Sequence, residues 1–68
     1  MTFRKIFMVE VYSNEGDLVE RRYAANMRTA ERIARENKEH KDGIIIRLLG
    51  KDERDFVNPD WVERYTTI

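Results

Sequence analysis

The sequence predicts an α+β fold of ββαββ order, in which a four-stranded, mostly antiparallel sheet carries one long helix on one face and a short helix follows at the C-terminus. Two segments of alternating apolar and polar residues flank a short polar turn, which is typical of a hairpin. An amphipathic segment of helical period follows, and then an aliphatic run typical of a central strand. A right-handed crossover between the second and third strands favours the sheet order 2-1-3-4. The chain, 1–68, is short enough to predict one domain.

The hairpin extends from Phe3 to Ala24. Its first strand, Phe3 to Tyr12, places apolar residues on both faces of the sheet. One face carries Phe3, Phe7, Val9 and Val11, and the other carries Ile6, Met8, Glu10 and Tyr12. The turn at 13–17 contains Gly16, which can adopt a positive φ. The second strand is Leu18 to Ala24, and a cross-strand pair of Glu10 with Arg22 or Arg47 explains a carboxylate on an otherwise apolar face.

The helix is predicted from Met27 to Lys41. Asn26 precedes it and is a good N-cap, because its side chain can accept hydrogen bonds from the free amides of the first turn. Apolar residues three and four apart form a narrow stripe of Met27, Ala30, Ile33 and Ala34. We expect Ala34 to be buried between helix and sheet. Gly43 suits a left-handed position at the helix C-terminus.

The C-terminal third supplies the remaining elements. Gly43 to Leu49 is apolar on both faces and predicts the third strand. A polar turn separates it from Arg54 to Asn58, which we predict to be a short edge strand with Phe56 pointing inward. Asn58 and Pro59 are typical of an N-cap and a first helical residue, so they predict a short helix from Pro59 to Tyr65.

Composition excludes several classes of function. Thirteen basic and thirteen acidic residues give a net charge of zero, so the chain lacks the basic excess usual in nucleic-acid binders. The absence of cysteine and the single His40 argue against disulfides and a structural zinc site. No apolar run approaches the roughly 18 residues of a membrane span. The sequence contains no catalytic constellation and no phosphate loop, so it predicts a non-enzymatic protein without a cofactor. We also expect the protein to be cytoplasmic and to have no contact with a membrane.

Basic residues on one helix face form the first candidate site. They are Arg28, Arg32, Arg35 and Lys38. As an alternative function, they predict a nucleic-acid-binding accessory protein whose helix contacts phosphates. Residues four apart also predict ion pairs on this helix, namely Glu31–Arg35, Arg32–Glu36 and Arg35–Glu39. Because acidic neighbours weaken the attraction for a polyanion, we favour a solvated, ion-paired surface over nucleic-acid binding.

The sheet face away from the helix is the second candidate site, because one helix covers only one face. Its apolar residues are Ile6, Met8, Tyr12, Ile45 and Leu49. Trp61 and Tyr65 either cover this face as core residues, which we favour, or anchor a protein interface. The candidate protein-binding residues are Trp61, Tyr65, Met8, Ile6 and Tyr12. The short C-terminal helix should leave part of the face uncovered, which predicts self-association as a two-fold dimer, as in a homodimeric structural or assembly protein.

The pattern also resembles a class of known proteins. A hairpin, then Tyr23-Ala24, then a helix with Ala30-Glu31 and Ile33-Ala34, then an aliphatic strand is similar to small bacteriophage and prophage proteins of ββαβ layout. The RNA polymerase inhibitor of T7-type phages and some small anti-CRISPR proteins are examples. The likeness covers Phe7 to Leu48 and contains no specific motif, so it transfers no binding residue. It implies a phage-encoded modulator or inhibitor that binds a host protein or protein complex.

Overall fold

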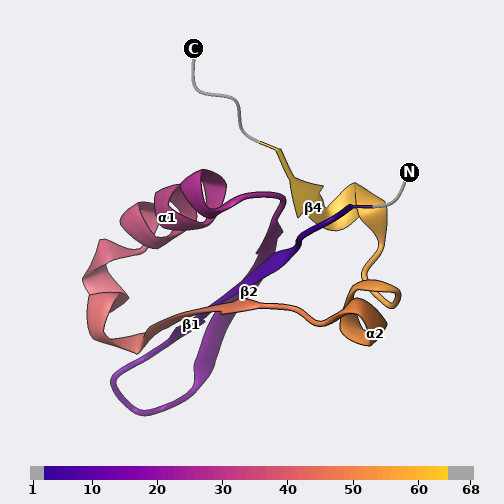
Figure 1. Cartoon of the computed structure of the whole chain (residues 1–68). Coiled ribbons are helices and arrows are strands. Elements are labelled where there is room, and N and C mark those ends of the chain that lie inside the picture. Colours follow the sequence, from indigo (N-terminus) through magenta and orange to yellow (C-terminus); the bar gives the residue numbers. More distant parts are fainter. Residues whose placement is uncertain (1–2, 65–68) are drawn as a thin grey trace.

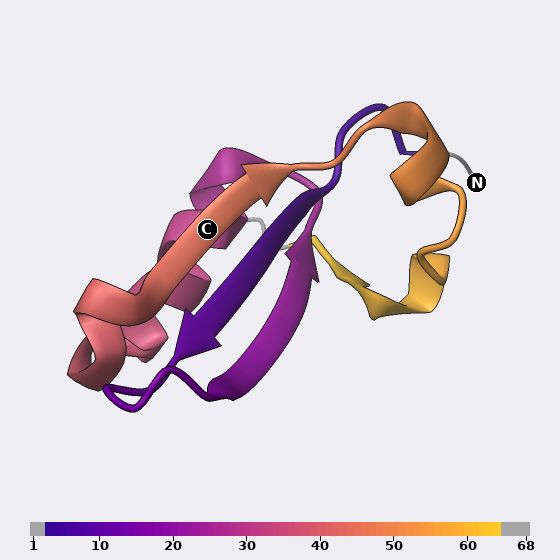
Figure 2. The same ribbon diagram turned by 90° about the horizontal axis from the view of Figure 1, so that it is seen from below.

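The computed structural model describes residues 3–64 and confirms the α+β class (Figure 1). The elements in chain order are β1 (Phe7–Tyr12), β2 (Leu18–Ala24), α1 (Met27–Glu36), the 3-10 helix η1 (Lys38–Gly43), β3 (Ile44–Leu48), α2 (Lys51–Arg54), the 3-10 helix η2 (Pro59–Trp61) and β4 (Val62–Glu63). The four strands form one mixed sheet in the order β3-β1-β2-β4. In Figure 2, β3, β1 and β2 lie side by side with α1 behind them.

The predicted strand order is correct for three strands and wrong for the fourth. β1 lies between β2 and β3 and pairs antiparallel with both. The last strand lies beside β2 and pairs parallel with it, with Val62 opposite Tyr23. The amide of Ala25 continues this pairing by donating to the carbonyl oxygen of Glu63 at 3.0 Å. β4 therefore occupies the outer edge of β2 only at Tyr23 and Ala24, and the outer edge of β3 receives no strand from the described residues.

The segment Arg54 to Asn58 is not an edge strand. Residues 51–54 form a helical turn, because Gly50 donates its amide to the Glu53 carboxylate at 3.1 Å and the chain then bends away from the sheet. Phe56 does not point inward and is 87 % exposed. Arg54 ties this bend to the N-terminal segment by donating to the carbonyl oxygen of Arg4.

The predicted C-terminal helix is a single 3-10 turn. Its start is confirmed, since the Asn58 side chain accepts from the amide of Asp60 at 2.9 Å and Pro59 follows as the first helical residue. The turn ends at Trp61, and the chain becomes extended because Val62 and Glu63 pair with β2. Tyr65 lies outside the described residues.

Helix α1 is shorter than predicted. Asn26 is the expected N-cap and accepts from the amide of Thr29 at 2.8 Å. The helix ends at Glu36, where the Asn37 side chain caps the carbonyl oxygen of Ile33 at 3.0 Å. The chain then continues as η1, which is kinked at His40. Lys41 is therefore in a 3-10 turn and not in the α-helix.

Two glycines have different roles. Gly16 has a φ of 89° in the hairpin turn, as predicted. Gly43 is not left-handed, so that expectation is wrong. A side chain on Gly43 would collide with the backbone carbonyl group of Tyr12. The residue must lack a Cβ because the end of η1 approaches the backbone at the end of β1 too closely for a side chain.

The buried face of α1 is rotated slightly about the helix axis relative to the predicted stripe. This face packs on the core between α1 and the sheet. The buried residues of that core are Val9, Ala24, Ala30 and Ile33, with Phe7, Ile44 and Ile46 packed at the margin. Thr29 is fully buried beside them, whereas Met27 is 45 % exposed and Ala34 is only partly buried. The capped start of the helix turns Thr29 and Ala30 toward the sheet and leaves Met27 at its outer edge.

A second, smaller core closes one end of the sheet. Ile6, Leu49 and Val62 are buried together, and Phe3, Met8, Tyr23, Ala25 and Val57 pack around them. This cluster joins the chain before β1, the end of β3 and the C-terminal strand. The expectation that Trp61 is a core residue covering the sheet face away from the helix is therefore wrong, because Val62 is buried with Ile6 and Leu49 whereas Trp61 is mostly exposed.

Candidate protein-binding face

Among residues 3–64, no second layer of secondary structure covers most of the sheet face opposite α1. We call it the open face, and it consists of Met8, Glu10, Tyr12, Arg21, Tyr23, Ile45 and Arg47. The smallest dimension of the molecule is 16 Å, which accommodates one sheet and one layer of helix. The open face is therefore a surface and not an interior.

An ion pair occupies the middle of the open face. Glu10 on β1 is opposite Arg21 on β2, and its Oε2 accepts from Nη2 at 2.8 Å and from Nε at 3.0 Å. This hydrogen bond raises the pKa of Arg21 above its ordinary value. The predicted cross-strand partner was Arg22 or Arg47, but Arg22 lies on the helix face. Glu10 is thus satisfied within the sheet and is not available as an unpaired catalytic carboxylate.

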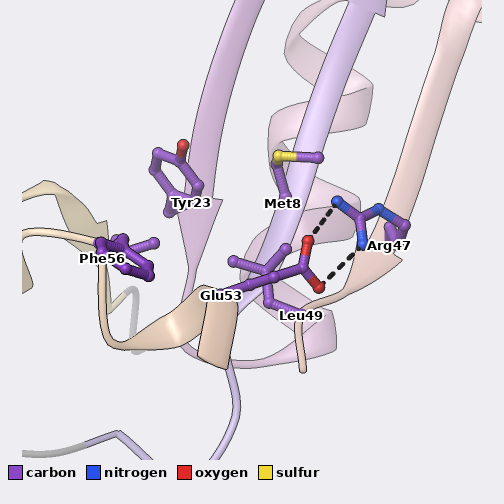
Figure 3. Close-up of a pocket in the computed structure, with 7 residues that line it drawn as sticks. Met8, Tyr23, Arg47, Leu49, Glu53 and Phe56 are labelled. Carbon is purple, nitrogen blue, oxygen red and sulfur yellow. Dashed lines mark hydrogen bonds and ion pairs between the residues drawn. The ribbon is translucent and has the colours of Figure 1, made fainter. Parts of the chain in front are cut away.

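A cleft of about 270 Å³ opens at the end of this face, where α2 bends toward the sheet (Figure 3). Its lining consists of Met8, Tyr23, Arg47, Leu49, Glu53, Phe56 and Val57. Most of these side chains are apolar, and they come from all three long strands, the loop after β3, α2 and the loop after it. The cleft therefore exists only because the 51–57 segment folds back beside the sheet.

The polar groups in the cleft neutralise each other. Arg47 and Glu53 form a two-pronged pair, with Nη1 to Oε1 at 3.1 Å and Nη2 to Oε2 at 2.9 Å (Figure 3). The hydrogen bond from Arg47 lowers the pKa of Glu53, and the amide of Gly50 lowers it further. Neither group is left as an unpaired charge that would call for a charged ligand.

Two exposed aromatic residues lie beside the cleft. Phe56 belongs to its lining and is the most exposed large apolar residue among those described. Trp61 stacks on Tyr23, with ring centroids 6.2 Å apart and planes inclined by 20°, and is still 57 % exposed. Phe56 and Trp61 therefore extend the apolar surface of the cleft on the side of the C-terminal segment.

The structure separates the predicted protein-binding residues into different environments. Met8 lines the cleft, and Trp61 contacts it through Tyr23. Ile6 is buried in the second core and cannot touch a partner. Tyr12 is four residues from Met8 along β1, about 13 Å away at the rise of a strand. Tyr65 is outside the described residues, so the expectation for it is not addressed.

Sequence reasoning missed five of the seven residues that line the cleft, namely Tyr23, Arg47, Glu53, Phe56 and Val57. Tyr23 lies on the open face but was not chosen as a site residue. Phe56 and Val57 were assigned to a strand that does not form. The signal that could have corrected this assignment is Gly50 followed three residues later by Glu53, because a carboxylate in the first turn favours a helix N-terminus.

The basic helix face is only partly neutralised. Arg32 pairs with Glu36 at 3.5 Å, as predicted. The predicted Arg35–Glu39 pair is not formed in the described part of the chain, because α1 ends before Glu39 and the four-residue spacing is lost there. The Glu31–Arg35 pair is also not formed within residues 3–64. Arg28, Arg35 and Lys38 are exposed.

Other classes of site have little support in residues 3–64. No group of three or more histidine, cysteine or acidic side chains gathers there in a way that could hold a metal ion. No helix in the same part of the chain has the length and apolar character needed to cross a membrane. Comparisons of the chain with protein-family models, with curated proteins and with solved structures find no match.

Proposed function

We propose that this protein is a small non-enzymatic protein-binding module that inserts an apolar side chain of its partner into the cleft beside Met8, Tyr23 and Leu49. The observation that carries the proposal is the exposure of Phe56 and Trp61 next to an apolar cleft whose charged groups are already paired. In keeping with the phage resemblance, the proposed partner is a component of a host macromolecular machine, which the protein modulates or inhibits.

The size of the cleft favours a protein partner over a small molecule. Small-molecule pockets are typically about 300–1,000 Å³ and enclose most of the ligand. The cleft here is about 270 Å³ and lies open at the surface. One aliphatic or aromatic side chain fits such a space, and the flanking rings then rest against the rest of the partner's surface.

The chemistry of the rim also fits a protein interface. Tryptophan, tyrosine, phenylalanine, methionine and arginine are enriched in such interfaces, and a few central anchors supply most of the binding energy. Tyr23, Phe56 and Trp61 have few rotatable bonds, so holding them at an interface requires little loss of side-chain entropy. The Arg47–Glu53 pair is neutral as a unit, and its remaining donor and acceptor groups can bond to backbone groups of the partner while the pair stays intact.

Site-specific photo-crosslinking tests the proposal. A benzophenone amino acid is placed at position 56, beside the cleft, and in a matched variant at position 28, on the exposed surface of α1. After irradiation in a bacterial lysate, a specific partner should be captured from position 56 and not from position 28. The captured protein must then bind the unmodified chain as a purified component. Equal capture from both positions would contradict a role for the cleft.

A second candidate function is supported by the exposure of Arg28, Arg35 and Lys38 on α1. These side chains could contact phosphates, as expected for a nucleic-acid-binding accessory protein. We rank this function below protein binding because the helix also carries exposed Glu31 and Glu36, and the chain has no net positive charge.

A further inference from the structure

We infer that the free edge of β3 is a self-association site, where two copies of the chain pair their β3 strands antiparallel about a two-fold axis. This inference concerns a different surface from the cleft and does not depend on the proposed function. It also moves the predicted dimer contact from the sheet face to the sheet edge. The argument follows from the direction of the backbone groups, the register and the side chains of Ile44–Leu48.

The hydrogen-bonding groups of β3 alternate between β1 and solvent. The amide of Leu49 donates to the carbonyl oxygen of Ile6 at 2.9 Å, and these two residues are opposite each other in the register of the pair. In an antiparallel pair such residues exchange hydrogen bonds at every second position. Ile45 and Arg47 therefore also direct their backbone groups to β1. The amides and carbonyls that point outward belong to Ile44, Ile46 and Leu48.

The two edges of the sheet differ in how they are protected. On the other edge, β4 covers only Tyr23 and Ala24. The rest of β2 carries the charged residues Glu20, Arg21 and Arg22 and a register irregularity near its start, which blunt it. β3 is five residues long, has no proline and has no irregularity in its pairing with β1. Natural edge strands are usually blunted by charges, bulges or proline. The single charge on β3 is Arg47, and Glu53 of the same chain neutralises it.

The sequence of β3 is self-complementary in one register. When Ile46 lies opposite Ile46 of the second copy, Ile44 lies opposite its Leu48, and all the outward backbone groups of both strands find partners. On the open face, Arg47 then lies opposite Ile45 of the second copy. A register centred on Arg47 would place two arginines together, which is destabilising. A register centred on Ile45 would leave the groups of Leu48 unpaired.

The same register covers exposed apolar side chains. Leu48 is 52 % exposed and Ile45 is 50 % exposed in the single chain. Pairing covers Leu48 with Ile44 of the second copy on the helix face and covers Ile45 with the arginine stem on the open face. A five-residue strand pair is smaller than a standard interface of about 1,200–2,000 Å². We therefore expect a weak dimer that forms at high micromolar concentration.

Hydrogen exchange measured by NMR tests the inference on the unmodified chain. The amides of Ile45 and Arg47 should be protected at every protein concentration, because they bond to β1. The amides of Ile44, Ile46 and Leu48 should become at least tenfold better protected as the concentration rises into the millimolar range. Outward amides that exchange equally fast at all concentrations would contradict the pairing.

Sedimentation equilibrium with a backbone-modified chain tests the same contact. The chain is short enough for chemical synthesis, so N-methyl-isoleucine can be placed at position 46, where it removes only an outward donor. This variant should keep the circular dichroism spectrum of the parent and dimerise at least tenfold more weakly. Phe56→Ser is the control and should dimerise like the parent, which separates this result from any failure of the cleft to bind a partner.

Two outcomes would overturn the inference. The first is a failure of the sedimentation test. It occurs if the parent chain sediments as a monomer at millimolar concentration, or if the N-methylated chain dimerises as well as the parent. The second is a monomeric parent whose N-methylated form loses affinity for a captured partner protein. In that case the edge of β3 accepts a strand from the partner and not from a second copy. If the N-methylated chain does not fold, the hydrogen-exchange result on the parent decides.

Discussion

Glu63 binds Arg22 with both carboxylate oxygens, at 2.7 Å to Nε and 2.6 Å to Nη2. Through this pair the short strand β4 is attached to β2 by side chains as well as by backbone. Nη1 of the same guanidinium donates to Glu36 of α1 at 2.8 Å and lies 3.4 Å from Glu20 of β2. Arg22 thus links three elements, and its pKa is raised, mainly by the hydrogen bond to Glu63.

We predict that Glu63→Gln destabilises the protein, because it removes the charge from this two-pronged contact while keeping the shape. Hydrogen bonds to charged groups contribute about 1.5–3 kcal/mol, and partial exposure of the pair places the loss at the lower end. For a domain of this size, about 1 kcal/mol lowers the melting temperature by about 4–8 °C. Thermal unfolding followed by circular dichroism measures the loss. Glu15→Gln, in the exposed hairpin turn, is the control and should melt like the parent.

Acid should destabilise the protein through Glu36 and Glu53. Arg22 lowers the pKa of Glu36 and Arg47 lowers that of Glu53, in each case below the ordinary value of 4.5. A carboxylate with a lowered folded-state pKa contributes stability above its unfolded pKa and loses it as the pH falls through the folded value. Urea midpoints should therefore decrease below about pH 4.5 and decrease less steeply in Glu36→Gln and Glu53→Gln. Parallel curves for parent and variants would contradict these pairings.

Gly43→Ala should be strongly destabilising although the residue does not have a positive φ. An added methyl group would overlap the backbone of Tyr12, and neither segment can move without disturbing β1 or β3. Overpacking of this kind costs about 1–3 kcal/mol. Gly50→Ala is the matched control, because its added carbon would meet only the Glu53 carboxylate at an ordinary 3.6 Å. Equal urea midpoints for the two variants would contradict the close approach of Gly43 to the Tyr12 backbone.

Ala30 and Ala34 distinguish the observed rotation of α1 from the predicted one. Ala30 is fully buried against Val9 and Ala24, whereas Ala34 is partly exposed. Ala30→Leu should therefore lose about 1–3 kcal/mol by overpacking, and Ala34→Leu should lose less. Glu31→Leu, on the exposed side, should have little effect. A larger loss of unfolding free energy for Ala34→Leu than for Ala30→Leu would contradict the observed rotation and support the stripe predicted from the sequence.

Local signals in the sequence predicted local structure well. The alternation of β1 placed Val9 and Glu10 on the correct faces, Asn26 marked the start of the helix, and Gly16 marked the turn. Each of these features depends on residues close together in the chain. The helix stripe was less accurate, because Met27 and Thr29 lie on opposite edges of it, and the contact with the sheet determines which edge is buried.

The C-terminal part could not be predicted in the same way. Residues 51–63 form elements of two to four residues, and such short elements have almost no periodicity to detect. Their positions depend on distant partners, such as Tyr23 for Val62 and Arg22 for Glu63. The cleft was missed for this reason, because it forms only where the 51–57 segment meets the sheet.

The cleft is tested most directly by a binding titration of the purified partner captured at position 56. Phe56→Ser removes an exposed ring that makes no contribution to either core, so the variant should fold like the parent. Calorimetry should show at least tenfold weaker binding for Phe56→Ser, which corresponds to about 1.4 kcal/mol. Glu31→Ser, on the exposed surface of α1, should bind like the parent. Equal affinity of Phe56→Ser and the parent would contradict protein binding at the cleft.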